Sequence, residues 1–223
     1  MMTKTKRIQL SVFIMFFLCI LVTSTILAQG VPSLSDILQK FIESTVPPRG
    51  YRVDFVQTIL KSELKVERGV SISTQRQISQ ATFELTYNPS RGPLISEKKT
   101  TQLVPPEKPP KPSTAYVKMD MLRFLNDLLA WKESQIMLDT LNRRNFYRIS
   151  SANNGLSCKL WVDAENWYVY KLILYIHGQK FSETIIEYRW VNDRYWLPSK
   201  ILMEHSDGTN LTQEFGEYIL NVK

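Results

Sequence analysis

The sequence predicts an α+β protein in which a few helices cover a strongly curved, mostly antiparallel sheet that forms an incomplete β-barrel. Three observations lead to this fold class. Apolar residues recur with helical spacing in two short stretches, and they alternate with polar residues in many stretches of strand length. Turn signals separate the later stretches at intervals of about ten residues, which favours hairpins of antiparallel strands.

The composition is that of a chain that folds around a hydrophobic core. The 223 residues are 43% hydrophobic and 22% charged, with two cysteines and a formal net charge of +7. These values exclude a disordered chain, a collagen and a small disulfide-stapled protein. The length suits one large domain or two small ones, and we expect a single domain over residues 29–223.

The N-terminal stretch predicts export. Three basic residues precede an uncharged run from Ile8 to Ala28, where a small residue offers a cleavage position. We therefore expect residues 1–28 to be a signal peptide and the mature protein to be periplasmic. The run is also as long as the roughly 20 residues that span a bilayer, so its retention as an inner-membrane anchor stays open. Cleavage would remove three basic residues and no acidic one, leaving a mildly basic chain without a basic cluster.

A helix is predicted at the start of the mature chain. Ser33 and Asp36 have the spacing of a helix cap, and Pro47-Pro48 ends the apolar pattern that follows them. The predicted buried face carries Leu34, Ile37, Leu38, Phe41 and Ile42.

Strands follow this helix, because the apolar period changes to two at Tyr51. We expect half-buried strands over residues 51–59 and 81–87, with a weaker strand, 66–73, between them. A turn rich in proline and glycine is expected at 88–93.

The middle of the chain combines a proline-rich loop with a second helix. Residues 104–112 can form neither a helix nor a central strand, and they predict a stiff surface connection or a ligand for a proline-reading partner. The helix that follows presents Met121, Leu122, Leu125, Leu128 and Leu129 on one face. Ile136, Met137 and Leu141 are predicted to continue or follow this helix.

From Asn145 onward the sequence consists of strand-length segments between turns. The turns are predicted at 153–155, 163–166, 177–179, 192–193 and 207–210. The segment 167–176 is apolar on almost both faces, so it needs apolar groups, either core helices or a lipid-like ligand, on each side. One face of the next strand carries Ser182, Thr184, Ile186, Tyr188 and Trp190.

Compact catalytic motifs are missing from the sequence, which has no GxSxG, HExxH, GxGxxG, P-loop or CxxC pattern. His177 and His205 lie beside turn residues, and Glu183 and Glu187 share one face of a strand, as a solvated row does. Cys158, the lone cysteine of the mature chain, cannot form an internal disulfide. We therefore expect no enzyme, no metal site, no cofactor and no nucleic-acid partner.

Several segments together resemble the LolA-like family of periplasmic outer-membrane lipoprotein carriers. The first is the order of signal, helix and Tyr51-x-Val53-x-Phe55-x-Gln57, which is similar to the opening of these carriers. The similarity is densest after residue 157, in Leu160-Trp161-Val162-Asp163, Val169-Tyr170-Lys171-Leu172, Glu187-Tyr188-Arg189-Trp190-Val191-Asn192-Asp193-Arg194-Tyr195-Trp196-Leu197-Pro198 and Phe215-Gly216-Glu217-Tyr218-Ile219-Leu220-Asn221. It covers nearly all of residues 33–223.

The resemblance implies a bent, incomplete antiparallel barrel whose cavity, closed by a helical lid, holds acyl chains. The implied function is a monomeric, non-enzymatic carrier that transfers a lipoprotein or lipid towards the outer membrane, between an inner-membrane donor complex and an outer-membrane acceptor. Candidate lipid-binding residues are Phe55, Phe83, Leu85, Leu172, Leu174, Ile186, Trp190, Ile201 and Met203 on the strands, with Leu125 and Leu128 on the lid helix.

An alternative stays open beside the carrier. A sensor or adaptor of related fold would bind lipidated or unfolded envelope protein and regulate a membrane partner, and an uncleaved anchor would favour it because a shuttle must diffuse. One departure from the family also bears on the lid. The carriers have an arginine before the proline that ends the early strand, where this chain has Asn88, so any lid must be held in another way.

Overall fold

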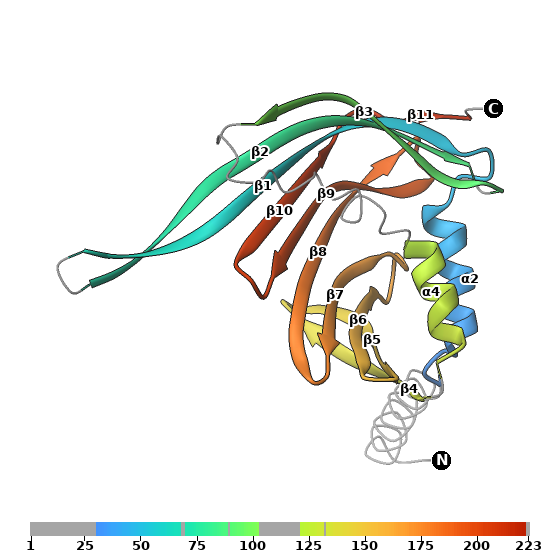
Figure 1. The fold of residues 1–223 in the computed structure, drawn as a ribbon. Helices are drawn as coiled ribbons and strands as arrows, with labels where there is room; N and C mark the ends of the chain where they lie inside the picture. Colours follow the sequence, from blue (N-terminus) through green and yellow to red (C-terminus); the bar gives the residue numbers. More distant parts are fainter. Residues whose placement is uncertain (1–29, 68–69, 89, 103–120, 132, 222–223) are drawn as a thin grey trace, which may run out of the picture. The chain divides into compact units, whose positions relative to one another are not determined.

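The computed structural model describes residues 30–67, 70–88, 90–102, 121–131 and 133–221 (Figure 1). For residues 63–67 and 70–72 it describes the backbone alone. The predicted signal peptide or anchor and the proline-rich loop lie outside the described residues. Residues Ser33–Lys223 cluster as one compact unit, separate from Met1–Pro32.

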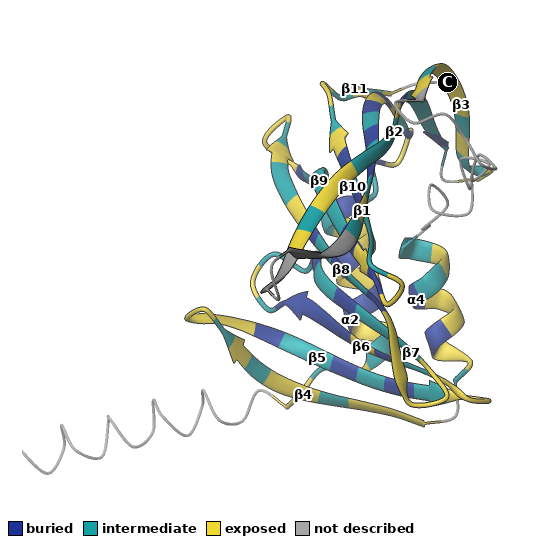
Figure 2. Cartoon of the chain, turned by 60° about the vertical axis from the view of Figure 1, so that its left-hand side comes forward, coloured by how far each residue is buried: buried dark blue, intermediate teal, exposed yellow. Residues whose placement is uncertain are grey.

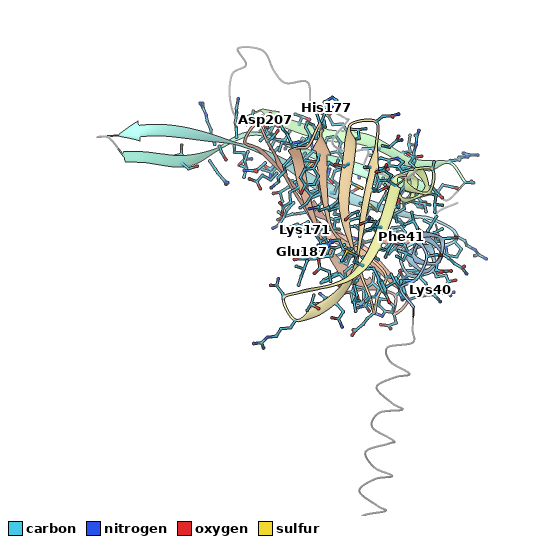
Figure 3. All side chains as sticks on the ribbon, turned by 90° about the horizontal axis from the view of Figure 1, so that it is seen from below. Lys40, Phe41, Lys171, His177, Glu187 and Asp207 are labelled. Carbon is cyan, nitrogen blue, oxygen red and sulfur yellow. The ribbon has the colours of Figure 1, made fainter. Side chains whose placement is uncertain are left out.

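Both predicted helices form. Helix α2 spans Leu34–Thr45, and Ser33 and Asp36 cap it reciprocally: the Ser33 hydroxyl accepts from the Asp36 amide, and the Asp36 carboxylate accepts from the Ser33 amide. Helix α4 spans Met121–Leu129. Their buried residues lie on the predicted apolar faces, Ile37, Leu38 and Phe41 on α2 and Leu125 and Leu128 on α4. Ile42 and Leu129, at the C-terminal ends of these faces, are exposed instead. Figure 3 labels Phe41 on the sheet side of α2 and Lys40 further from the sheet.

The described strands form one antiparallel sheet. Their order is β3-β2-β1-β10-β9-β8-β7-β6-β5-β4, and β11 pairs with β1 beside β10, so the sheet stays open with β3 and β4 at its edges. The strands are β1 (Tyr51–Glu67), β2 (Val70–Asn88), β3 (Gly92–Gln102), β4 (Glu133–Leu141), β5 (Arg144–Asn153), β6 (Leu156–Asp163), β7 (Val169–Ile176), β8 (Gln179–Val191), β9 (Tyr195–His205), β10 (Thr209–Phe215) and β11 (Ile219–Leu220). The sheet bends around the helices (Figure 1).

The predicted turns of the C-terminal half all connect consecutive strands. Asn154-Gly155 and His177-Gly178 make two-residue hairpin loops in which every residue has a positive φ, as the type I′ turn requires. Gly50 shows why glycine is needed before β1: its φ is +76°, and a Cβ there would lie 2.1 Å from the Tyr87 carbonyl oxygen.

Two expectations are wrong. The segment 66–73 is not a separate strand, because Val66 and Glu67 end β1 and the described residues from Val70 begin β2. These two strands pair from Tyr51↔Tyr87 to Glu67↔Val70, with one register shift between Ile59 and Leu60. The residues from Ile136 to Leu141 do not continue the helix. They belong to β4, which pairs with β5 along its whole length, and this pairing overrides the helical spacing of their apolar side chains.

Candidate functional site

One face of the sheet carries nearly all of the predicted lipid-binding residues. Directly opposed residues of antiparallel strands share a face, and the register opposes Phe55 to Phe83, and Ile186 to Ile201. The same rule joins Met203, Thr184 and Leu172 across β9, β8 and β7. This face is concave and receives helices α2 and α4 (Figure 1). Sequence alternation alone identifies the two faces of a strand and cannot tell which one the sheet wraps inward.

The helices cover one part of this concave face. Ile37, Leu38 and Phe41 of α2 and Leu125 and Leu128 of α4 pack with the buried residues Ile149, Cys158, Leu160, Val162, Val169, Leu172 and Ile186, and Leu174 and Ile201 border this cluster. Two smaller clusters extend the apolar face beyond it. Phe55, Ala81 and Phe83 form one, and Ile59, Met203 and Leu211 form the other. The concave face is therefore apolar across most of the sheet.

A cavity of about 130 Å³ lies between the helices and this face. Leu85, Ile186 and Ile201 are the candidate residues that line it. The rest of its lining was not singled out as a site from the sequence: Phe41, Thr45, Val46, Tyr51, Tyr87, Pro93, Met121, Leu122, Tyr188, Leu197 and Pro198. Met121 and Leu122 belong to the apolar stripe that predicted the helix, but only packing shows which end of that stripe faces the cavity.

Other candidate residues lie outside this cavity. Leu125 and Leu128 are fully buried in the core beneath α4. Leu172 is fully buried in the same cluster, and Leu174 is partly buried at its border. Trp190 is 47% exposed, and its ring lies 4.9 Å from that of Trp196 near the end of β8. The apolar stripe of α4 therefore contains two kinds of residue: Leu125 and Leu128 belong to the core, and Met121 and Leu122 line the cavity.

Tyr51, Tyr87 and Tyr188 contribute polar hydroxyl groups to the lining of this apolar cavity. The rings of Tyr51 and Tyr87 stack with their centroids 5.2 Å apart, and Tyr188 stacks on Tyr168 at 4.5 Å. Burial raises the pKa of the Tyr188 hydroxyl well above its usual value, so this group stays neutral at physiological pH. The cavity lining therefore carries no charge at neutral pH.

Buried polar side chains also lie on the concave face. Gln57 and Gln213 face each other from β1 and β10, and the Gln213 amide donates to the Gln57 carbonyl oxygen at 3.0 Å. Thr184 is completely buried, and within the described part of the chain its hydroxyl has no hydrogen-bond partner. Such a group costs about 1–3 kcal/mol.

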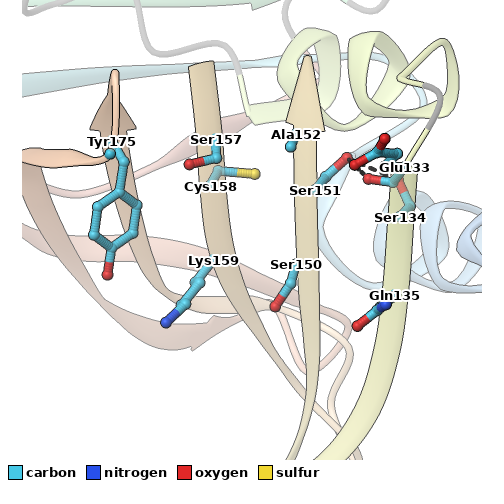
Figure 4. A pocket seen from close by; sticks show the side chains of 11 residues that line it. Glu133, Ser134, Gln135, Ser150, Ser151, Ala152, Ser157, Cys158, Lys159 and Tyr175 are labelled. Atoms are coloured by element: carbon cyan, nitrogen blue, oxygen red, sulfur yellow. Dashed lines mark hydrogen bonds between the residues drawn. The ribbon is translucent and has the colours of Figure 1, made fainter. Parts of the chain in front are cut away.

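A larger hollow of about 560 Å³ lies across β4–β7, and most of the residues that line it have polar side chains (Figure 4). The Ser134 and Ser151 hydroxyl oxygens are 2.8 Å apart there. Cys158 also lines it, and burial raises the pKa of its thiol to about 11. The thiol is therefore protonated at neutral pH and is a poor nucleophile. This hollow suits neither an alkyl chain nor thiol catalysis.

Glu183, a carboxylate on the outer face of the sheet, is ion-paired. Glu183 lies 2.6 Å from Lys171 and 2.7 Å from Lys180, and hydrogen bonds from these lysines lower the pKa of its carboxyl group. Figure 3 labels Lys171 and Glu187 near each other on neighbouring strands. Among the described residues no group of three or more His, Cys, Asp or Glu side chains could hold a metal ion. No helix in the described ranges has the length and hydrophobicity to cross a membrane.

Comparison with known proteins shows likeness in structure and not in sequence. No protein-family model and no curated protein matches the sequence. An outer membrane lipoprotein-sorting protein domain from Vibrio parahaemolyticus aligns with a TM-score of 0.50 and 11% identity over 84% of this chain and 93% of that one. A LolA superfamily protein from Nitrosomonas europaea aligns at 0.46 and 11% over 86% and 95%, and a chain of the Pseudomonas aeruginosa MucA/MucB complex at 0.31 and 11% over 84% and 94%.

At 11% identity the likeness to the Vibrio domain concerns the fold alone. In this chain the shared fold is an open, bent antiparallel sheet with helices on its concave face. The predicted structural resemblance is therefore confirmed at the level of the fold, which this chain shares with the lipoprotein-sorting protein domain from Vibrio parahaemolyticus.

Proposed function

We propose that this chain is a non-enzymatic periplasmic carrier that holds the acyl chains of a lipoprotein or lipid and transfers them towards the outer membrane. The fold it shares with a lipoprotein-sorting domain supports the carrier class. The observation that carries the proposal is the apolar concave face, with a cavity between that face and helices α2 and α4.

The lining of the cavity matches the chemistry of an acyl chain. Each buried CH₂ group contributes about 0.8 kcal/mol, and an alkyl chain, which has no hydrogen-bonding groups, needs a continuous apolar surface. Leu85, Ile186 and Ile201 supply this surface from the strands, and Met121 and Leu122 supply it from α4.

The volume of the cavity implies that the helices move when a ligand enters. Pockets for drug-sized ligands measure about 300–1,000 Å³, and this cavity holds about 130 Å³. The apolar clusters around Phe55 and Met203 continue the concave face beyond the helices. We propose that α4 shifts from the sheet and opens a path for the chain along this face.

No covalent step is part of this function. The cavity lining is uncharged, the Cys158 thiol is protonated and Glu183 is held by two lysines. The carrier would take its cargo from an inner-membrane donor complex and release it to an outer-membrane acceptor.

Native mass spectrometry of protein purified from an envelope fraction without detergent tests this function. We expect a stoichiometric ligand that organic extraction identifies as an acylated molecule. A ligand-free mass for folded protein would contradict the carrier and favour a sensor or adaptor that binds protein on the same fold.

Two variants of α4 test the cavity itself. Leu122→Glu places a carboxylate in the cavity lining and should abolish ligand retention, because an ionised group resists burial beside an alkyl chain. Leu129→Glu is the matched control, since Leu129 lies on the same helix but is 46% exposed. Circular dichroism and urea unfolding establish that both variants fold. Full ligand retention by folded Leu122→Glu would contradict the site.

A further inference from the structure

The two edges of the sheet differ in how they are protected. A strand at an edge exposes backbone N–H and C=O groups that can pair with another strand, and natural proteins guard such edges with lysine, proline or a bulge. Edge strand β3 has all three. It begins with Gly92-Pro93, carries Lys98 and Lys99, and its register with β2 shifts between Thr82 and Phe83.

Edge strand β4 has none of these devices. Its nine residues contain no proline and no basic residue, and its register with β5 runs unbroken from Glu133↔Ala152 to Leu141↔Arg144. None of its residues is buried, and Met137 and Leu138 are 49% and 58% exposed (Figure 2). Within the described part of the chain β4 pairs with β5 alone. A regular, apolar edge of this length is a template for strand addition.

We propose that β4 pairs antiparallel with β4 of a second copy of this chain, about a two-fold axis through Met137. The two sheets then join edge to edge with their concave faces on the same side. The strand is chemically self-complementary in this register, because Met137 opposes its own copy and Ile136 opposes Leu138. Two of the remaining pairs oppose polar residues, Gln135 to Asp139 and Ser134 to Thr140. In the last pair Glu133, at one end of the strand, opposes Leu141, at the other end.

Charge and polarity favour this register over its neighbours, because a two-fold axis at Leu138 would oppose Asp139 to Met137 and Thr140 to Ile136. A two-fold axis at Ile136 would oppose Glu133 to Asp139, and an axis at Asp139 would oppose that carboxylate to itself, and like charges directly opposite destabilise a strand pair. Asp139 is in addition held on its own chain, 3.4 Å from the Arg148 guanidinium and 3.0 Å from the Trp161 ring nitrogen. The Met137-centred pair therefore leaves no two carboxylates opposed.

The pairing also buries the side chains that the free edge exposes. On the concave side Ile136, which borders the core beneath the helices, would lie beside Leu138 of the second copy. On the outer side the two Met137 side chains would cover each other. This dimer departs from the monomer that the sequence resemblance implies, and it does not depend on the proposed carrier function.

Analytical ultracentrifugation and site-directed cross-linking test the dimer and its register. We expect protein purified from the envelope without detergent to sediment as a dimer. Under mild oxidation Met137→Cys should form a disulfide-linked dimer, because opposed residues bring their Cβ atoms to about 4.5–5.5 Å. Gln135→Cys is the matched control: its opposing residue is Asp139, so it should remain uncross-linked, as should the wild type, whose Cys158 is buried. A monomeric wild type, or a Gln135→Cys yield equal to that of Met137→Cys, would overturn the proposal.

Charges introduced at Met137 give a second test that does not depend on oxidation. Met137→Lys and Met137→Glu should each sediment as monomers, because each opposes a charge to its own copy, and an equal mixture of the two should dimerise again. Leu156→Lys, at a 50% exposed position in the β5–β6 hairpin, controls for added charge and should remain a dimer. Dimers of Met137→Lys alone, or a mixture that stays monomeric, would refute pairing through β4.

Discussion

Gln57 and Gln213 satisfy each other on the concave face. The Gln213 Nε2 donates to the Gln57 Oε1 at 3.0 Å, and both side chains are buried between strands β1 and β10. Replacing Gln213 with Leu leaves the Gln57 amide without this partner and should lower the free energy of unfolding by about 1–3 kcal/mol. The double variant Gln57→Leu/Gln213→Leu removes both polar groups and should cost far less. Urea unfolding of the four proteins measures the coupling, and additive losses would contradict the pairing.

Asp163 organises the turn between β6 and β7. Its carboxylate accepts hydrogen bonds from the amides of Glu165 and Asn166 and from the Arg144 guanidinium, the last at 2.6 Å, and the side chain is only 3% exposed. Asp163→Ala therefore should destabilise the protein by about 2–4 kcal/mol. Arg144→Ala should cost less than about 1 kcal/mol, because Arg144 is half exposed. Thermal unfolding compares them, and equal losses would show that the ion pair dominates the turn.

Local signals predicted the parts of this fold that local chemistry decides. The cap formed by Ser33 and Asp36 begins α2 where the sequence places it. Asn154-Gly155 and His177-Gly178 make the tight turns that their φ requirements dictate. Neither feature depends on distant partners, so one sequence is enough to find it.

Features that depend on distant partners were missed. The spacing of Met137 and Leu141 fits a helix, and only the pairing of β4 with β5 makes that segment a strand. The stripe on α4 contains both Leu125 and Leu122, yet the first is core and the second lines the cavity. The packing of α4 against the sheet decides between them, and no periodicity encodes that packing.

The buried hydroxyl of Thr184 should lower the free energy of unfolding by a measurable amount. Its hydroxyl is fully buried, with no partner among the described residues. Thr184→Val keeps the shape and removes this group, so the ligand-free protein should gain about 1–3 kcal/mol of stability in urea unfolding. Thr86→Val, on the outer face of β2, should stay within about 0.5 kcal/mol of wild type. A loss of stability in Thr184→Val would mean that the hydroxyl binds a buried water or ligand.

The burial of His205 predicts how the free energy of unfolding changes in mild acid. Burial lowers its pKa below the ordinary 6.5, and the nearby Asp207 carboxylate opposes this shift only in part. The folded protein therefore holds the neutral ring, whereas the unfolded chain binds a proton as the pH falls through 6.5. Stability should be at its full value above pH 7 and should decline from there towards the lower pKa of the folded state.

The stability that Glu183 contributes to the folded protein is lost over a separate, lower range of pH. Its pKa is lowered by Lys171 and Lys180, so its contribution is present above its ordinary value of 4.5 and declines below it. Urea unfolding between pH 7.5 and pH 5 thus isolates the histidine. His205→Gln, which has no titrating ring, should flatten the curve across that range. An unaltered slope in His205→Gln would assign the pH dependence to another group.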